Sequence, residues 1–310
     1  MILTVTPNPM LDKILWLDEL RFGATHRAQR MGMIAGGKGI NVARALTGLG
    51  ENTLATGFLG GPTGAAIRAL LERENIPHDF IETAAATRTG FTLVEVESGR
   101  RTAVFEPGSQ LQAGEVEALI RRVEQLLPGC RALALCGSMP CAGFDRLYAD
   151  LLRLAHVWRI PVFLDSYLAP LKAGLEAQPQ FLKPNREEAL QTFGLDARAP
   201  GGMQKLLHLL SSSGAQCIFV TDAARPLGVM LNGKQYSTVP PKIASPNPLG
   251  GGDALVAGFL YAWLHGIREL ELLRFAVAAG TVNAMHDTPG YADLEEIKAC
   301  MERVQIEALS

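Results

Sequence analysis

Residues 115–221 alternate regularly between segments typical of helices and segments typical of strands. The sequence predicts helices at 115–127, 144–156, 168–176, 186–193 and 203–212, and strands at 131–136, 161–164, 181–183 and 217–221. Consecutive strands that are joined by helices run parallel, and a parallel sheet is covered on both faces. The alternation therefore predicts an α/β fold with a central, mostly parallel sheet covered by helices on both faces.

The first part of the chain begins the same way but adds two small β segments. A strand at 2–6, a strand at 53–57 and a helix at 63–74 continue the α/β pattern. Strand-like runs also occur within 11–35, and a hairpin with strands at 91–96 and 101–105 is predicted within 87–108. No internal repeat or linker divides the sequence. We therefore predict one domain, residues 1–310, with a small β-sheet lid built from about 11–35 and 87–108.

The composition is typical of a soluble intracellular protein. The formal net charge is −2, with 48% hydrophobic and 19% charged residues and no basic stripe, which argues against nucleic acid as a partner. No run approaches the ~20 apolar residues of a membrane-spanning helix. Because the five cysteines are odd in number and scattered, neither a disulfide framework nor a zinc site is expected. We expect a cytoplasmic protein that does not bind membranes.

Polar residues follow several predicted strands at the points where these strands end. Ser138, Asp165 and Asn185 each come shortly after a strand, and Asp12 follows the turn that ends the strand at 2–6. Ligands of open α/β sheets bind outside the carboxyl ends of the strands. These residues are therefore candidates for ligand contacts, while an Asx-turn role for Asp12 stays open as an alternative.

The stretch from 247 to 259 carries the strongest signal of a site. Gly250, Gly251 and Gly252 precede Asp253 and an apolar, Ala-rich helical run. Glycines let backbone N–H groups face an anion at the start of a helix. A carboxylate at that position suits the removal of a hydroxyl proton beside a transferring phosphoryl group. On spacing alone, an ordinary N-cap role for Asp253 is an equal alternative.

A second glycine-rich turn runs from Gly36 to Asn41, before a predicted helix at 42–46, and we expect Asn41 near its N-cap. The spacing from Gly32 to Lys38 is that of a P-loop, but Gly39 stands where the magnesium-binding Ser or Thr would be, which argues against one. The turn instead suits the approach of a sugar, with Asn41 contacting hydroxyls and Lys38 contacting a phosphate. A plain glycine-rich loop is the alternative.

In this order, the motifs resemble those of the ribokinase-like (PfkB) carbohydrate kinases, in the branch that contains 1-phosphofructokinase and tagatose-6-phosphate kinase. The resemblance covers nearly the whole chain. It rests on seven ordered segments: Thr6–Asp12, Gly36–Asn41, Thr87-Arg88, Glu106–Gly108, Gly137–Pro140, Lys183–Glu188 and Gly250–Phe259. One glycine turn alone would be weak evidence, whereas seven ordered matches are specific.

The resemblance implies an ATP-dependent kinase that phosphorylates a hydroxyl of a phosphorylated ketohexose. Fructose 1-phosphate is the first expectation, and tagatose 6-phosphate or another sugar is the alternative. The resemblance also implies a ribokinase-like fold and a homodimer that forms through the lid.

The resemblance also implies roles for individual residues. Asp253 would be the catalytic base, with Gly250, Gly251 and Gly252 as the anion hole. Sugar contacts are implied for Asp12, Gly36, Gly37, Asn41 and Ser138, and contacts with the phosphate of the sugar for Arg27, Lys38 and Arg88. ATP contacts are implied for Lys183, Asn185, Thr221, Gly250 and Gly252. Glu188 would serve Mg²⁺, which prefers oxygen ligands.

Four places depart from the family pattern. Asn247-Pro248 replaces Asp-Thr, Ala223 and Pro226 replace the glycines of a turn near the nucleotide, Gly90 replaces a lid Asn, and Tyr167-Leu168 replaces Ser-Gly. Because these changes surround the substrates rather than the base, they bear mainly on substrate and cation use.

Two rival functions follow from the same residues. A non-catalytic sensor of sugar phosphate or nucleotide would tolerate the departures, but the retained Asp253 and its three glycines argue against it. A dinucleotide-dependent enzyme is disfavoured, because Pro7-Asn8-Pro9 stands where a G-x-G-x-x-G turn would open the first helix.

Overall fold

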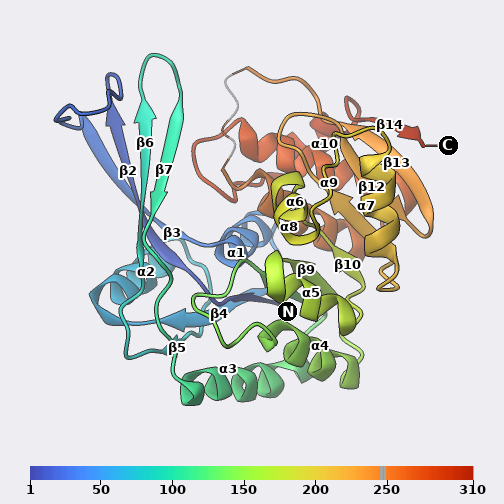
Figure 1. Ribbon diagram of the computed structural model, residues 1–310, viewed down its shortest axis with the longest axis horizontal. Coiled ribbons are helices and arrows are strands. Elements are labelled where there is room, and N and C mark those ends of the chain that lie inside the picture. The colour runs from blue at the N-terminus through green and yellow to red at the C-terminus, as the bar shows by residue number, and fades with distance from the viewer. Residues whose placement is uncertain (245–246, 248, 310) are drawn as a thin grey trace.

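The computed structural model describes residues 1–244, 247 and 249–309, and it contains two β-sheets (Figure 1). Within these residues, the larger sheet has ten strands in the order β14-β13-β12-β11-β10-β9-β8-β1-β4-β5, and the smaller has four in the order β3-β2-β6-β7. The predicted α/β class with an additional small sheet is confirmed. Among the described residues, no helix has both the length and the apolar character needed to cross a membrane.

The middle of the larger sheet is parallel, as predicted. Its strands are β1 (Ile2–Thr6), β4 (Thr53–Leu59), β8 (Ala132–Cys136), β9 (Val162–Asp165), β10 (Phe181–Leu182) and β11 (Cys217–Val220). Three antiparallel strands extend one edge, β12 (Leu227–Leu231), β13 (Lys234–Val239) and β14 (Gln305–Ala308). The short β5 (Ile81–Glu82) pairs with β4 at the other edge. β1 and β8 are buried along their whole length, as strands covered on both faces must be.

Each face of the larger sheet has its own hydrophobic core. On β1, Ile2 faces one core and Leu3 faces the other, because side chains alternate along a strand. The first core includes residues of α1 (Lys38–Gly48), α8 (Gly251–Leu264), α9 (Glu269–Ala284) and α10 (Leu294–Met301). The second includes residues of α3 (Ala113–Leu126), α4 (Leu147–Val157), α5 (Leu168–Glu176), α6 (Arg186–Phe193) and α7 (Gly202–Ser211).

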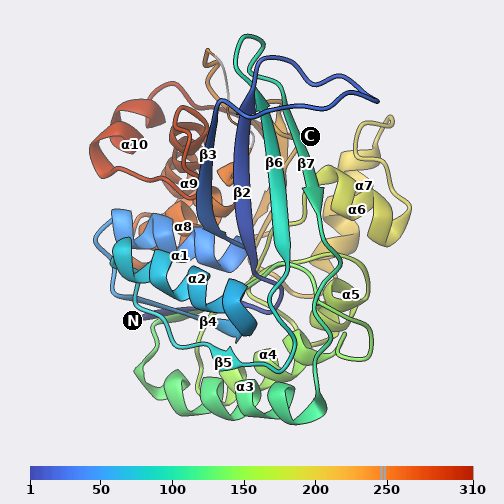
Figure 2. The same cartoon turned by 90° about the vertical axis from the view of Figure 1, so that its left-hand side faces the viewer.

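The smaller sheet, here called the lid sheet, stands beside α1 and α2 (Gly61–Arg73), as Figure 2 shows. It consists of β2 (Met10–Leu17), β3 (Arg30–Gly36), β6 (Thr89–Glu95) and β7 (Arg101–Phe105). Asp12 on β2 pairs with Ile34 and Gly90, so these three residues share one face. Leu15 pairs with Met31 and Leu93 on the opposite face. These strands lie in the two segments from which a lid was predicted.

Two parts of the secondary structure differ from the prediction. α1 begins at Lys38 with Gly37 as its N-cap, so Asn41 lies within the helix rather than near its cap. The helix starts early because it is pressed against β1, where a Cβ on Gly39 would lie only 2.4 Å from Thr6 Oγ1. In addition, the antiparallel strands β12–β14 and the helices α9 and α10 lie beyond the alternation on which the sequence prediction was based.

We predict that Ala223→Gly stabilises the protein. Ala223 is exposed and has a φ of 51°, a left-handed conformation that costs a residue with a Cβ about 1–2 kcal/mol. Glycine removes this strain but loses about 0.5–1 kcal/mol more backbone entropy on folding. The free energy of unfolding, measured by urea denaturation, should therefore rise by up to about 1.5 kcal/mol.

Ala224→Gly is the matched control. Ala224 is also exposed, but its φ does not lie in the left-handed region. Glycine at this position should lower the free energy of unfolding by about 0.5–1 kcal/mol. Equal effects of the two substitutions would contradict the assignment of strain to Ala223.

Candidate active site

The candidate site lies at the carboxyl ends of the parallel strands. Asp165 is the last residue of β9, Lys183 follows β10, and Thr221 follows β11. An isolated bridge joins Asn185 to Thr221. These strands are neighbours in the sheet, so residues that are far apart in sequence meet at one edge.

The glycine turn before α8 is packed too closely for side chains. Gly250 is the N-cap of α8 with a φ of 79°, and a Cβ on it would lie 2.7 Å from Gly290 N. A Cβ on Gly252 would lie 3.1 Å from Lys183 Nζ, so this ammonium borders the first turn of the helix. The helix N-terminus and Lys183 together favour an anion at this place.

Asp253 is buried in the first turn of α8. Its Oδ2 accepts a hydrogen bond of 2.8 Å from Asn41 Nδ2 on α1. Burial, together with repulsion from Asp165, raises the pKa of Asp253 from the ordinary value of 3.8 to about 6, against the opposing effects of Lys38 and Asn41. A carboxyl whose pKa is near neutrality is well suited to accept a hydroxyl proton.

Two lysines and two carboxylates form an ion-paired cluster beside Asp253. Lys38 Nζ lies 2.7 Å from Asp165 Oδ1 and 2.5 Å from Glu188 Oε1, and Lys183 Nζ lies 2.9 Å from Asp165 Oδ2. Burial alone would lower the pKa of Lys38, but Asp165 and Glu188 outweigh it and hold the pKa above its ordinary value. Burial alone would likewise raise the pKa of Asp165, and the two lysines hold it below its ordinary value.

Asn185 and Glu188 have a structural role at the start of α6. Asn185 Oδ1 accepts from Glu188 N at 2.8 Å, and Glu188 Oε2 accepts from Asn185 N at 2.8 Å, which is a capping box. Within the described residues, no group of three or more His, Cys, Asp or Glu side chains is placed to hold a metal.

The lid sheet presents Asp12 on its inner face. Asp12 is buried, and its carboxylate accepts from Thr92 Oγ1 at 3.1 Å. Burial raises the pKa of Asp12, while the bond from Thr92 opposes this. Gly36 and Gly37 are closely packed: Gly37 has a φ of 129°, and a Cβ on it would lie 2.7 Å from the side-chain atom Thr6 Cγ2 and 3.2 Å from Pro9 Cα. These glycines bring the lid strand and α1 together.

Arg88 and Ser138 lie at the base of the lid sheet and share a contact with Asn8. Arg88 Nη2 donates to Asn8 O at 3.3 Å and Nη1 donates to Glu106 O at 3.4 Å, while Asn8 Nδ2 donates to Ser138 Oγ at 3.0 Å. Burial lowers the pKa of Arg88. Among the described residues, Arg88 Nε has no hydrogen-bond partner, and no carboxylate forms an ion pair with the Arg88 guanidinium.

Three basic residues predicted to converge on a sugar phosphate do not meet. Lys38 is held by Asp165 and Glu188, because the early start of α1 turns it toward the ends of β9 and β10. Arg27 is exposed in the loop between β2 and β3, beyond the Trp16–Arg30 pair at the far end of these strands. Arg88 alone of the three lies at the base of the lid sheet.

Two asparagines support the glycine turn and were not predicted as site residues. Asn283 Nδ2 donates to Leu249 O at 2.8 Å, and its Oδ1 accepts from Gly290 N at 2.7 Å. Asn247 Nδ2 donates to His286 O at 3.0 Å and to Asp287 O at 3.1 Å. In the sequence, Asn247 is distinguished only as a departure from the family motif. Asn283 stands in an Ala-rich helix, where no motif marks it.

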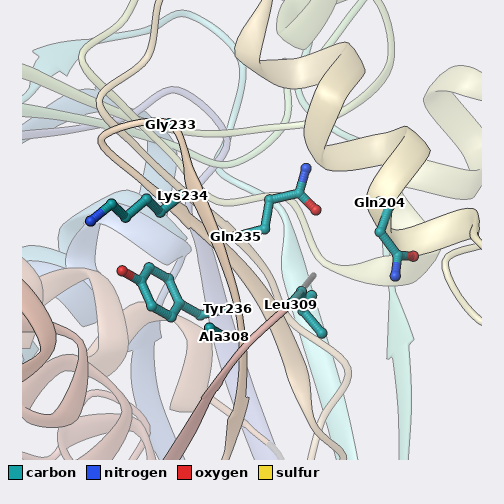
Figure 3. A pocket seen from close by; sticks show the side chains of 7 residues that line it. All are labelled: Gln204, Gly233, Lys234, Gln235, Tyr236, Ala308 and Leu309. Carbon is teal, nitrogen blue, oxygen red and sulfur yellow. The ribbon is translucent and has the colours of Figure 1, made fainter.

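A separate cleft lies beside the β12–β13 turn and the C-terminal strand (Figure 3). It is lined by Gln204, Gly233, Lys234, Gln235, Tyr236, Ala308 and Leu309. None of the predicted site residues lines it. Asp253, the two lysines and the N-terminus of α8 lie instead at the carboxyl ends of the parallel strands.

Comparison with known proteins agrees with this geometry. Residues 8–293 match the family model described as "pfkB family carbohydrate kinase". The chain belongs to the pfkB family of carbohydrate kinases. Membership implies the use of ATP as phosphoryl donor and a carbohydrate as acceptor.

Solved structures of kinases extend the comparison over the full chain. A "possible 1-phosphofructokinase" from Thermotoga maritima is 26% identical, with a TM-score of 0.90 over 100% of this chain and 99% of that one. Phosphofructokinase-2 from Escherichia coli, solved in complex with potassium, is 25% identical, with a TM-score of 0.89 over 97% and 98% of the two chains. The same enzyme in complex with fructose-6-phosphate gives 25% identity and a TM-score of 0.87 over the same shares.

We predict that Asp253→Asn makes this kinase more stable but far less active. The pKa of Asp253 is raised from 3.8 to about 6, so its ionised form destabilises the folded state by up to about 3 kcal/mol above pH 6. Below pH 3.8 the group is protonated in both states and the effect is gone. The variant should therefore gain much more free energy of unfolding at pH 8 than at pH 4. Its turnover should fall by about 10²–10⁴-fold.

Glu97→Gln serves as the control for this prediction. Glu97 is exposed near the tip of the β6–β7 hairpin, so replacing it should leave turnover and the free energy of unfolding unchanged. Near wild-type kcat in Asp253→Asn would show that Asp253 is not the base. A stability gain of equal size at both pH values would contradict the raised pKa.

Proposed function

We propose that this protein transfers the γ-phosphoryl group of ATP to a hydroxyl of a phosphorylated ketohexose, with fructose 1-phosphate as the first candidate and fructose 1,6-bisphosphate as product. One observation carries the proposal. Asp253, whose pKa is raised to about 6, stands in the first turn of α8 beside three closely packed glycines and Lys183. A base next to an anion-binding helix N-terminus is what phosphoryl transfer to a hydroxyl requires.

In the proposed step, the hydroxyl oxygen of the sugar attacks the γ-phosphorus and the bond from this phosphorus to the bridging oxygen of ADP breaks. Asp253 takes the hydroxyl proton. The N–H groups at Gly250, Gly251 and Gly252 stabilise the negative charge on the transferring group. Asn41 occupies Oδ2 of Asp253, which leaves Oδ1 for the substrate.

Lys38 and Lys183 support the donor end of this proposal. Lys183 Nζ lies beside the first turn of α8, and both ammonium groups pair with the carboxylate of Asp165. A triphosphate can exchange phosphate oxygens for these carboxylate contacts, and lysine binds phosphate as a point charge. Asn185 and Thr221 would contact the nucleotide, and Glu188 would serve Mg²⁺ held by the phosphates. Mg²⁺ supplies charge neutralisation of the β- and γ-phosphates.

Arg88 supports a phosphorylated acceptor. Arg88 is half-buried, and its two hydrogen bonds are 3.3 Å and 3.4 Å long. Its Nε is buried and has no partner within the described residues. A buried cation without a counter-charge is unfavourable. A phosphate monoester would satisfy the guanidinium in bidentate fashion. Asp12, Gly36, Gly37, Asn41 and Ser138 would contact the remaining sugar atoms, and a structural relative has been solved with fructose-6-phosphate.

We predict that the wild type strongly prefers a phosphorylated ketohexose to the free sugar. A coupled assay with ATP and Mg²⁺ would compare kcat/KM for fructose 1-phosphate, fructose 6-phosphate, tagatose 6-phosphate and fructose. Arg88→Ala should lose the preference mainly through KM, by roughly 10–100-fold, because a charge-assisted contact contributes about 1.5–3 kcal/mol.

Arg100→Ala is the control, since Arg100 belongs to the same sheet but is exposed and paired with Glu95 at the hairpin. Its kcat/KM values should match those of the wild type. Equal use of fructose and its phosphates by the wild type would contradict a phosphorylated acceptor. Binding of sugar phosphate with no transfer to any acceptor would favour the sensor hypothesis instead.

Asn247 bears on monovalent cations, because a structural relative was solved with potassium. The amide of Asn247 donates two hydrogen bonds to the carbonyls of His286 and Asp287, and its Oδ1 accepts from Leu249 N at 3.1 Å. These bonds join the glycine turn to the loop after α9. The amide thereby places an N–H donor against two carbonyl oxygens, where a carboxylate would instead add negative charge.

We predict that wild-type activity changes little when sodium or choline replaces potassium at fixed ionic strength. In Asn247→Asp, the two donors are lost and a carboxylate is gained, so activity should fall without potassium and recover when it is added. Steady-state kcat measured in the three chloride salts tests both statements. Several-fold stimulation of the wild type by potassium would overturn the inference.

The outer face of the lid sheet supports a homodimer. Leu15, Met31, Met33, Phe91 and Val104 lie on this face, as the strand register places them. Met31, Met33 and Val104 are exposed. A second copy of the chain, which presents the same apolar face, would cover it through a two-fold contact.

A further inference from the structure

Arg44 is a buried arginine one helical turn after Asn41 on α1. Its Nη1 donates to Asn41 Oδ1 at 2.8 Å and to Pro289 O at 2.9 Å. Its Nη2 donates to Ala35 O at 2.8 Å, and its Nε donates to Glu74 Oε2 at 2.5 Å. Each nitrogen of the guanidinium thus has a protein partner.

The contact with Asn41 determines which way its amide faces. A side-chain amide has one end that accepts and one end that donates hydrogen bonds. Arg44 can only donate, and the ionised Asp253 can only accept. Because Asn41 lies between them, with Oδ1 toward Arg44 and Nδ2 toward Asp253, only one of its two amide orientations satisfies both neighbours.

We propose that Arg44 is a positioning residue for the base. It holds the Asn41 amide in the orientation in which Asn41 Nδ2 donates to Asp253 Oδ2. This bond stabilises the carboxylate and keeps Asp253 Oδ1 directed toward the acceptor hydroxyl. The catalytic part of this inference rests on the proposed kinase function of Asp253.

The other contacts of Arg44 keep this arrangement in register. Ala35 is at the end of lid strand β3, and Pro289 is in the loop that packs on the glycine turn. A Cβ on Gly290 would lie 2.4 Å from Asn41 O, so the backbone of this loop touches α1 directly. One guanidinium therefore joins the lid sheet, α1 and the loop beside Gly250, the three parts between which Asp253 is held.

The first test is the pH profile of kcat/KM in Arg44→Met. Without Arg44, the Asn41 amide can turn and the donor to Asp253 is lost. A lost donor disfavours the carboxylate, so its pKa rises and the acidic limb of the profile moves to higher pH by about one unit, with about a fivefold loss at pH 6. Arg44→Lys, whose single ammonium cannot reach all partners, should shift it in the same direction. Arg73→Met, an exposed arginine near the end of α2, is the matched control.

A double-mutant cycle separates positioning from general damage. If Arg44 acts through Asn41, Arg44→Met should cost little more in an Asn41→Ala background, so the two effects are strongly non-additive. The same fold loss in both backgrounds would overturn the proposal. An acidic limb at the wild-type position in Arg44→Met would also overturn the proposal. If the methionine variant does not fold, an unmoved limb in Arg44→Lys would overturn it instead.

A measurement without turnover keeps this proposal distinct from the proposed function. The carboxyl ¹³C resonance of Asp253, assigned by its loss in Asp253→Asn, can be titrated by NMR in the absence of substrates. A higher pKa in Arg44→Met or Arg44→Lys than in the wild type supports positioning by Arg44 even if no acceptor is phosphorylated. An unchanged titration overturns the proposal, whatever the kinase assays show.

Discussion

The buried carboxylate of Asp165 is the constraint on which the site depends. It has no exposed surface, and it lies between Lys38 and Lys183 at 2.7 Å and 2.9 Å. A buried charge is tolerated only when paired charges and hydrogen bonds compensate its desolvation. The partners come from α1 and from the end of β10, so the sheet, α1 and the chain after β10 must be in register for Asp165 to be stable. Loss of either lysine would leave a buried charge without one of its partners.

The same cluster sets the chemistry of Asp253. Burial raises the pKa of Asp253, and repulsion from Asp165 raises it further, whereas the two lysines and Asn41 lower it. The balance gives a carboxyl that is ionised at neutral pH yet still basic enough to accept a proton. A buried carboxylate of this kind costs stability above its pKa.

The sequence predicts those features that depend on local pattern. Alternating segments were sufficient for the parallel sheet and its helices, and strand ends were sufficient to bring Asp165 and Asn185 to one edge. The direction of Lys38 was wrong because it depends on where α1 begins. That start is determined by the packing of Gly37 and Gly39 against Thr6, a long-range contact that no local pattern reveals.

Arg44 was missed for a related reason. Its spacing from Asn41 is visible in the sequence. The structural role of Arg44, however, depends on Pro289, Ala35 and Asp253, which only the fold brings near it. An arginine within an apolar helix could equally have been a surface residue. The antiparallel edge β12–β14 lay outside the βα alternation, so only its pairing in space shows that it extends the same sheet.

The two ends of the proposed reaction differ in how their cations are held. At the donor end, Lys38 and Lys183 are paired with carboxylates, so they are fixed in place before a nucleotide binds, and its phosphates need only exchange with existing partners. At the acceptor end, Arg88 makes two long bonds to backbone oxygens and lies over the Phe105 ring. Since no carboxylate among the described residues pairs with it, an arriving phosphate would supply the counter-charge. A triphosphate gains affinity from several groups, including the α8 N-terminus, whereas a phosphate monoester depends largely on one guanidinium. Selectivity for the acceptor should therefore be more sensitive to single substitutions than affinity for the nucleotide.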